Sequence, residues 1–327
     1  MAPRVEDYAP RLNVTIWTLT GVAALFLGLR LYCKVRRERP IRADDYVLVA
    51  SWFALATSCS MLSFITTIGY GRHNADIAPG NFNYILLISY MAGFFSILAA
   101  CWSKISFAIT LLYIVTGSRV KALLWFILVT VNLVLGASAT IQFAQCWPPE
   151  RLWHPGGPGH CWPRIVVIRF NIFVSAYSGC MDVVLALLPW VVVWTATISK
   201  KEKLSALFAM SMGVFAGITS FLKIKTLGAI GSPDLSASDS VNLLIFGSAE
   251  SAITIIAASI PILRGLLYVS KKQPRPQFYQ EPATKLHAPS AARVQKAQST
   301  DQGYDFQWLK WSHMDEDAED KERETRW

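Results

Sequence analysis

Seven stretches of mostly apolar residues, separated by short polar segments, organise this chain between Leu12 and Tyr268. A bilayer core of about 30 Å needs about 20 such residues in a helix. Each stretch is long enough, so the pattern predicts an all-α membrane protein, a seven-transmembrane helix bundle. The predicted spans cover residues 12–32, 46–69, 84–113, 121–142, 165–195, 204–228 and 241–268.

The composition agrees with this fold class. Of all residues, 53% are hydrophobic and 16% are charged, whereas soluble domains average about 25% charged residues. We expect a polar N-terminus over residues 1–11, the seven-helix domain over residues 12–268 and a tail over residues 269–327. There is no room for a separate catalytic domain. The net charge of +9 comes mainly from the membrane edges, so we expect no nucleic-acid partner.

The basic residues of the loops predict the orientation, because such residues stay on the cytoplasmic side. The first, third and fifth loops hold ten lysines and arginines, and the other three loops hold three. We therefore expect the N-terminus outside and the C-terminus in the cytoplasm. The tail is rich in Pro, Gln, Ser and charge, which predicts disorder. It contains one aromatic island at residues 306–311.

Two cysteines bracket the fourth loop, which the charge pattern places outside. An oxidising compartment permits a disulfide between Cys146 and Cys161, which would close a loop rich in Pro and Gly. The alternative is a metal site made by these cysteines with His154 and His160. Their spacing matches no common zinc pattern, so we expect the disulfide and no metal.

Two acidic residues and two prolines have a conformational explanation. Asp44 and Asp45 open the second span, where carboxylates accept free backbone N–H groups and complement the helix dipole. Helix capping is sufficient to explain them. Pro189 and Pro261 lie within the fifth and seventh spans and should kink those helices.

Ionisable groups inside the membrane are costly, so each is a candidate for a functional site. Counting 1.5 Å per residue places Lys104 and Asp182 at similar depth in the cytoplasmic half. We expect them to form an intramembrane ion pair. That pair could serve helix packing alone.

A second polar set lies in the outer half. Glu250 is too deep to reach the interface and needs a partner, a proton or a cavity. We expect a ligand-binding pocket floored by Glu250 and rimmed by Lys223 and Arg169, with Gln142 beside them and His73 at the mouth. The alternative is structural pairing of Glu250, with Lys223, Lys225 and Arg169 extending to the interface.

Several function classes are excluded by missing motifs. Residues 241–268 contain no lysine, which a retinal protein needs in its seventh helix for the Schiff base. There is no serine nucleophile elbow, P-loop or HExxH motif. We expect no cofactor.

A set of short motifs resembles the fungal rhodopsin-like seven-helix domain family, over about residues 17–267. That family includes receptor-like proteins of plant-pathogenic fungi and membrane proteins encoded in toxin gene clusters, such as the satratoxin cluster. The motifs are Arg42–Tyr46, Gly69–His73, Trp102–Ser106, Leu111–Tyr113, Gln145–Pro148 with Trp153 and Cys161, Asp182 ahead of Leu188–Pro189, and Glu250 ahead of Ile260–Arg264.

Two positions depart from the family pattern. Lys223 stands where an arginine is usual, and Gly265 stands where a proline is usual. The first changes a charge of the expected pocket, because lysine lacks the two-pronged guanidinium.

The resemblance implies a fungal, multi-pass integral membrane protein. We expect a receptor-like sensor of a small molecule, with the lipid bilayer, that ligand and a cytoplasmic signalling protein as partners. The alternatives are a membrane-embedded enzyme or accessory protein of secondary-metabolite biosynthesis, or a metabolite exporter. An enzyme would use Glu250, Asp182 and Lys104 as acid and base. The expected location is the plasma membrane, with an endomembrane as the alternative.

Overall fold

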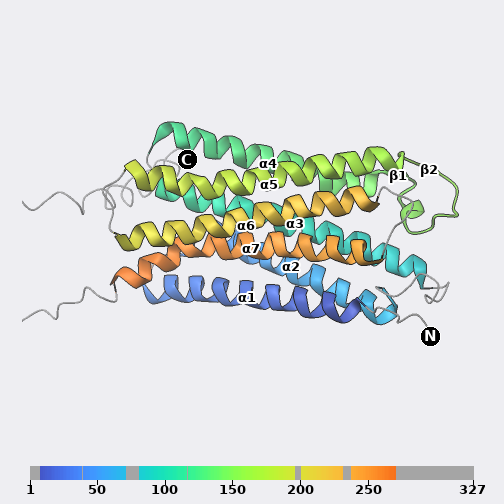
Figure 1. Ribbon diagram of the computed structural model, residues 1–327, viewed down its shortest axis with the longest axis horizontal. Coiled ribbons are helices and arrows are strands. Elements are labelled where there is room, and N and C mark those ends of the chain that lie inside the picture. Colours follow the sequence, from blue (N-terminus) through green and yellow to red (C-terminus); the bar gives the residue numbers. More distant parts are fainter. Residues whose placement is uncertain are drawn as a thin grey trace, which may run out of the picture. The chain divides into compact units, whose positions relative to one another are not determined.

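A computed structural model describes residues 8–38, 40–70, 81–115, 117–195, 200–230 and 237–269. This part of the chain contains seven long α-helices and one small two-stranded hairpin. The helices run back and forth as a bundle (Figure 1). They are α1 (Ala9–Arg36), α2 (Ala43–Ile68), α3 (Phe82–Ile114), α4 (Ser118–Ala144), α5 (Arg164–Thr195), α6 (Lys200–Ile230) and α7 (Ala237–Val269).

Each predicted span coincides with one helix, to within four residues at either end. Among the described residues, six helices are long and apolar enough to cross a membrane by length and composition, namely α1 to α5 and α7. The all-helical bundle predicted from the apolar stretches is therefore confirmed. Apart from Val269, the predicted tail lies outside the described residues.

A short hairpin connects α4 to α5 at one end of the bundle (Figure 1). It consists of strand β1 (Cys146–Trp147), the 3₁₀ turn η2 (Pro149–Leu152) and strand β2 (His160–Cys161), with the two strands antiparallel. The apolar pattern did not predict it. We call this the hairpin end of the bundle. Helix α1 also begins there, and the α1–α2 turn lies at the opposite end.

Helices α3 and α7 occupy the centre of the bundle. Helix α7 contacts α1, α2, α3 and α6, and α3 contacts α2, α4, α5 and α7. Helices α5 and α6 approach closely through small residues, as membrane helices often do. A Cβ atom at Gly217 of α6 would lie 2.8 Å from Cγ2 of Val183 on α5. Lys104 on α3 and Glu250 on α7 are therefore held inside the bundle, away from lipid.

Candidate functional site

Three ionisable side chains from three helices meet in the interior of the bundle. Lys104 of α3 places its Nζ atom 3.0 Å from the carboxylate of Asp182 on α5 and 2.9 Å from Oε1 of Glu250 on α7. The hydroxyl of Ser178 on α5 donates a hydrogen bond to the same Glu250 oxygen at 2.5 Å. These four residues are at most 3% exposed. We call Lys104, Asp182 and Glu250 the central cluster.

The central cluster differs from the two separate sets drawn from the sequence. Lys104 does contact Asp182, but the same ammonium group also contacts Glu250. Glu250 therefore joins Lys104 and Asp182 in one connected set of ion pairs. Counting residues along a helix could not reveal this, because the long, flexible lysine stem carries its ammonium group well away from its own Cα atom.

A cavity of about 300 Å³ lies beside the central cluster. Its lining runs from Glu250 to Gln145, the residue immediately before the hairpin. This volume is at the small end of the range for small-molecule sites, which typically have apolar walls and a few polar groups. The apolar walls are formed by Leu62, Ile97, Leu135, Ile141, Val167, Val174, Leu227, Leu243 and Leu244.

Two of the predicted pocket residues, Lys223 and Gln142, line this cavity together with Glu250. The Nζ atom of Lys223 on α6 lies 3.7 Å from Oε2 of Glu250, and its side chain is 25% exposed. That distance is too long for a hydrogen bond. Gln142 of α4 donates from Nε2 to the carbonyl oxygen of Tyr90 on α3 at 2.8 Å. Lys223 is therefore held less tightly than Lys104.

Two buried serine hydroxyls also line the cavity. Ser138 of α4 and Ser175 of α5 are each 4% exposed. Serine in a helix commonly donates to a carbonyl in the preceding turn. Within the described ranges, no hydrogen bond is found for either hydroxyl. Because buried polar groups are normally hydrogen-bonded, these two are available to a bound molecule.

The other predicted site residues lie elsewhere. Arg169 of α5 is exposed and is not part of the cavity lining. Lys225 of α6 is exposed as well. Both positions agree with side chains that extend along the surface of the bundle. His73 lies outside the described residues.

A disulfide between Cys146 and Cys161 joins the two strands of the hairpin, which confirms the predicted pairing. The metal alternative fails, because both thiols are consumed. The backbone N–H of Trp162 donates to the carbonyl oxygen of Gln145 at 2.8 Å. Since Gln145 also lines the cavity, the disulfide-bonded hairpin is connected directly to the cavity wall.

Removing the disulfide should destabilise the protein. The bond closes a segment with a sequence separation of 15, and a loop of this length corresponds to about 3 kcal/mol of unfolding free energy. We expect the double substitution Cys146→Ser and Cys161→Ser to lower thermal stability and to remove the electrophoretic shift caused by reduction. The exposed free thiol of Cys180 supplies the control Cys180→Ser, which should keep both properties. If reduction does not change the electrophoretic mobility of the wild-type protein, the prediction is contradicted.

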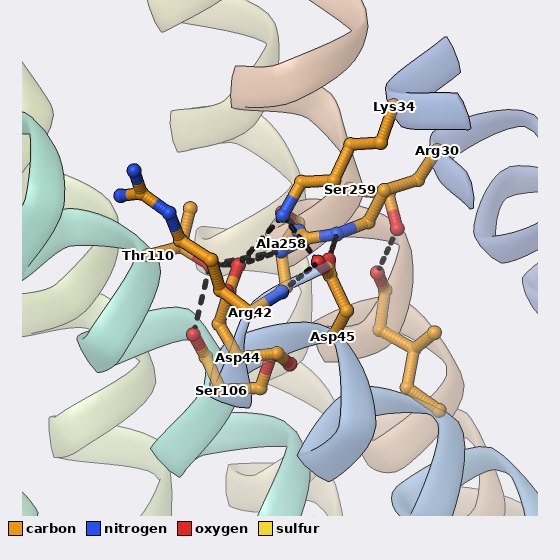
Figure 2. A network of polar contacts seen from close by, with 10 residues as sticks. Arg30, Lys34, Arg42, Asp44, Asp45, Ser106, Thr110, Ala258 and Ser259 are labelled. Carbon is orange, nitrogen blue, oxygen red and sulfur yellow. Dashed lines mark hydrogen bonds and ion pairs between the residues drawn. The ribbon is translucent and has the colours of Figure 1, made fainter. Parts of the chain in front are cut away.

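A second buried ionic cluster lies where α1 ends and α2 begins. Figure 2 shows its side chains. Arg30 of α1 is completely buried, donates from Nε to Oδ1 of Asp45 on α2 at 2.9 Å and also pairs with Asp44. Lys34, one turn later on α1, pairs with both aspartates. We call Arg30, Lys34, Asp44 and Asp45 the Arg30 cluster. It ties the start of α2 to the end of α1.

The Arg30 guanidinium also contacts both central helices. It donates to Oγ1 of Thr110 on α3 at 3.1 Å and to the carbonyl oxygen of Ala258 on α7. Pro261 lies three residues further along α7 and has no N–H, so the carbonyl of Ala257 loses its usual helical donor. Arg30 donates to the next carbonyl, that of Ala258, and not to the carbonyl of Ala257. One side chain therefore connects α1, α2, α3 and α7.

The capping explanation of Asp44 and Asp45 was incomplete. Asp45 does accept a hydrogen bond from the backbone N–H of Arg42 at 3.2 Å, as a cap. Both carboxylates are buried, however, and their main partners are Arg30 and Lys34. Sequence reasoning missed Arg30, although an arginine inside the predicted span 12–32 is itself a signal of a buried partner.

Long apolar helices that enclose buried ionic clusters and a small cavity define a polytopic membrane protein. Residues 29–269 match the family described as the fungal rhodopsin domain, and the chain belongs to this family. The resemblance drawn from the short motifs is therefore confirmed. The chain is a multi-pass integral membrane protein, with the lipid bilayer as its environment.

One curated relative is the Fugralins biosynthesis cluster protein 2 of Gibberella zeae. It is 21% identical to this chain over 284 residues, which cover 80% of the chain and 67% of the relative. No solved structure shows a significant match to the chain.

Proposed function

We propose that this protein is a receptor-like sensor that binds a small organic molecule in the cavity beside the central cluster. The observation that carries the proposal is the lining. Apolar walls surround Glu250, Lys223 and two serine hydroxyls without partners. Costly ionisable groups in a membrane interior are commonly retained for function. Glu250, Lys223 and Gln142 are the proposed ligand contacts, and Arg169 is left out because it does not line the cavity.

The arrangement of α3 supports a route from the cavity to the opposite end. Helix α3 carries Lys104 of the central cluster and, six residues later, Thr110, which contacts the Arg30 cluster. A ligand that shifts Lys104 would move a rigid helix that also contacts Arg30 and Asp44. The signal would then leave through the basic loops and the tail, toward a cytoplasmic partner.

We also propose that the hairpin end faces outside and that the C-terminus is cytoplasmic. The disulfide supports this orientation, since disulfides persist in oxidising compartments. The basic residues of the loops at the opposite end support it too. The plasma membrane is the proposed location, and the cavity would then accept a molecule from outside the cell.

A second candidate function is a role in secondary-metabolite biosynthesis, as an enzyme, accessory protein or exporter. The name of the curated relative, a biosynthesis cluster protein, favours it. An enzyme would use Glu250, Asp182 and Lys104 as acid and base groups. The sensor remains preferred, because in the described structure both carboxylates are already paired with Lys104, which leaves less freedom for proton transfer.

Filling the cavity tests whether it is the functional site. Gly247 of α7 lines the cavity, and a Cβ atom there would lie 3.4 Å from Oγ of Ser96 and 4.0 Å from Nζ of Lys223. Gly247→Ala should therefore fit, whereas Gly247→Leu should occupy the ligand space. We expect a fungal strain carrying Gly247→Leu to behave like a deletion strain, and one carrying Gly247→Ala to behave like the parent.

Metabolite profiles of these strains separate the candidate functions. A sensor predicts that no discrete intermediate accumulates and that whole pathways change together. A biosynthetic or export role predicts accumulation of one compound. Membrane abundance and a monodisperse elution profile should be equal for both variants. A correctly folded Gly247→Leu protein with parental behaviour would show that the cavity is not the site.

A further inference from the structure

The charges around the cavity indicate which kind of molecule it accepts. Lys104 and Lys223 supply two positive charges, and Asp182 and Glu250 supply two negative charges, all within one connected set of ion pairs. A charged ligand would leave one uncompensated charge in a medium of low dielectric constant, which is strongly unfavourable. With the proposed ligand cavity as its basis, we infer that the bound molecule is neutral, largely apolar and carries a hydroxyl group.

The gap between Lys223 and Glu250 suits a hydroxyl group in particular. The Nζ and Oε2 atoms are 3.7 Å apart, beyond hydrogen-bond range. An oxygen about 2.8 Å from each would close that gap. A hydroxyl both donates and accepts, so it can donate to Glu250 and accept from Lys223. An ether or carbonyl oxygen can only accept, and it would leave Oε2 of Glu250 without a hydrogen-bond donor.

The rest of the lining fits the same kind of molecule. Most of the residues that line the cavity are apolar, Leu62 and Leu244 among them. We therefore expect the body of the ligand to be apolar too. The unpartnered hydroxyls of Ser138 and Ser175 offer places for one further polar group. A volume of about 300 Å³ limits the ligand to a compact ring system or a short chain.

Three probes with one carbon skeleton test the charge preference. They are 2-naphthalenemethanol, 2-naphthoate and 2-naphthylmethylammonium, titrated into full-length protein in lipid nanodiscs, with empty nanodiscs correcting for partition into lipid. We expect the wild type to bind the neutral alcohol at least about tenfold more tightly than either ion. A wild type that prefers the anion or the cation would overturn the neutral assignment. The proposed binding cavity would survive that result.

Removing one charge beside the cavity should change which of the three probes binds most tightly. Lys223→Met leaves the set with one excess negative charge, so it should prefer the ammonium probe. Glu250→Gln leaves one excess positive charge, so it should prefer naphthoate. The double variant restores the balance and should prefer the alcohol again. Lys225→Met, on the exposed neighbour that does not line the cavity, should bind like the wild type.

Two outcomes separate this inference from the proposed function. If no probe binds to the wild type or to any folded variant, the cavity is not a ligand site and both proposals fail. If the probes bind but each charge variant prefers the same probe as the wild type, the cavity holds ligands. The assignment of a neutral hydroxyl compound is then wrong. The wild-type comparison needs no substitution, so a variant that fails to fold leaves the test intact.

Discussion

Replacing Arg30 with methionine is expected to reduce the unfolding free energy by about 3–5 kcal/mol, because it leaves buried charges without their main partner. Arg30 pairs with Asp44 and Asp45 and also donates to Thr110 and to the carbonyl oxygen of Ala258. Lys34 would remain as the one cation of the cluster. Thermal unfolding of purified protein in detergent should show a large drop of the midpoint temperature.

Two further variants calibrate the Arg30 result. Arg30→Lys keeps the charge but lacks the planar fork that reaches several acceptors at once, so it should fall between wild type and Arg30→Met. Arg42 is exposed, and its guanidinium lies 4.9 Å from the centre of the Tyr113 ring. Exposed contacts of this kind contribute about 0.5–1 kcal/mol, so Arg42→Met should have a small effect. Equal losses for Arg30→Met and Arg42→Met would contradict a buried ionic anchor.

Replacing Lys104 with methionine should have an effect of similar size. It would leave two buried carboxylates, Asp182 and Glu250, facing each other with Lys223 as the nearest cation. Breaking a buried ion pair by removing one partner costs about 3–5 kcal/mol. The expected result is low membrane abundance of the variant and a marked loss of thermal stability in detergent.

A rescue experiment shows whether Lys104→Met loses stability because two buried carboxylates are left without a cation or because the lysine side chain no longer fills its space. In the triple variant Lys104→Met, Asp182→Asn and Glu250→Gln, no ionised group of the central cluster remains, although Lys223 stays beside the cavity. Buried ion pairs can often be replaced by neutral residues of similar volume with little loss. The triple variant should therefore be more stable than Lys104→Met alone. If it is less stable still, the three side chains stabilise the bundle through shape and hydrogen bonds and not through charge.

The spans were predictable because hydrophobicity is a property of short windows of sequence. A helix must keep its backbone hydrogen bonds internal in lipid, so about 20 apolar residues already determine a helix and its approximate ends. The prediction of α1 to α7 depended on nothing beyond each window. The pairing of Cys146 with Cys161 was predictable for a related reason, since both cysteines flank one loop and belong to one short segment.

The site was only partly predictable. Counting residues along each helix placed Lys104 and Asp182 at the same depth in the membrane. It also showed correctly that Glu250 needs a partner. It did not show that Lys104 contacts both carboxylates. It placed Lys223 beside Glu250, but it did not show that Arg169 lies on an exposed surface away from the cavity. The rotation of each helix about its axis determines these contacts, and that rotation follows from packing against several neighbours at once.

The sequence by itself therefore determined the membrane class, the number of helices, the disulfide and which polar residues must avoid lipid. The tertiary structure decided which of those residues meet. Arg30 shows the difference most clearly. The sequence shows that residue 30 is a charged arginine. Its partners, however, belong to α2, α3 and α7, up to 228 positions away along the chain. Hydrophobic partition acts on each segment separately, whereas ion pairing depends on distances between segments, and these exist only once the helices have packed.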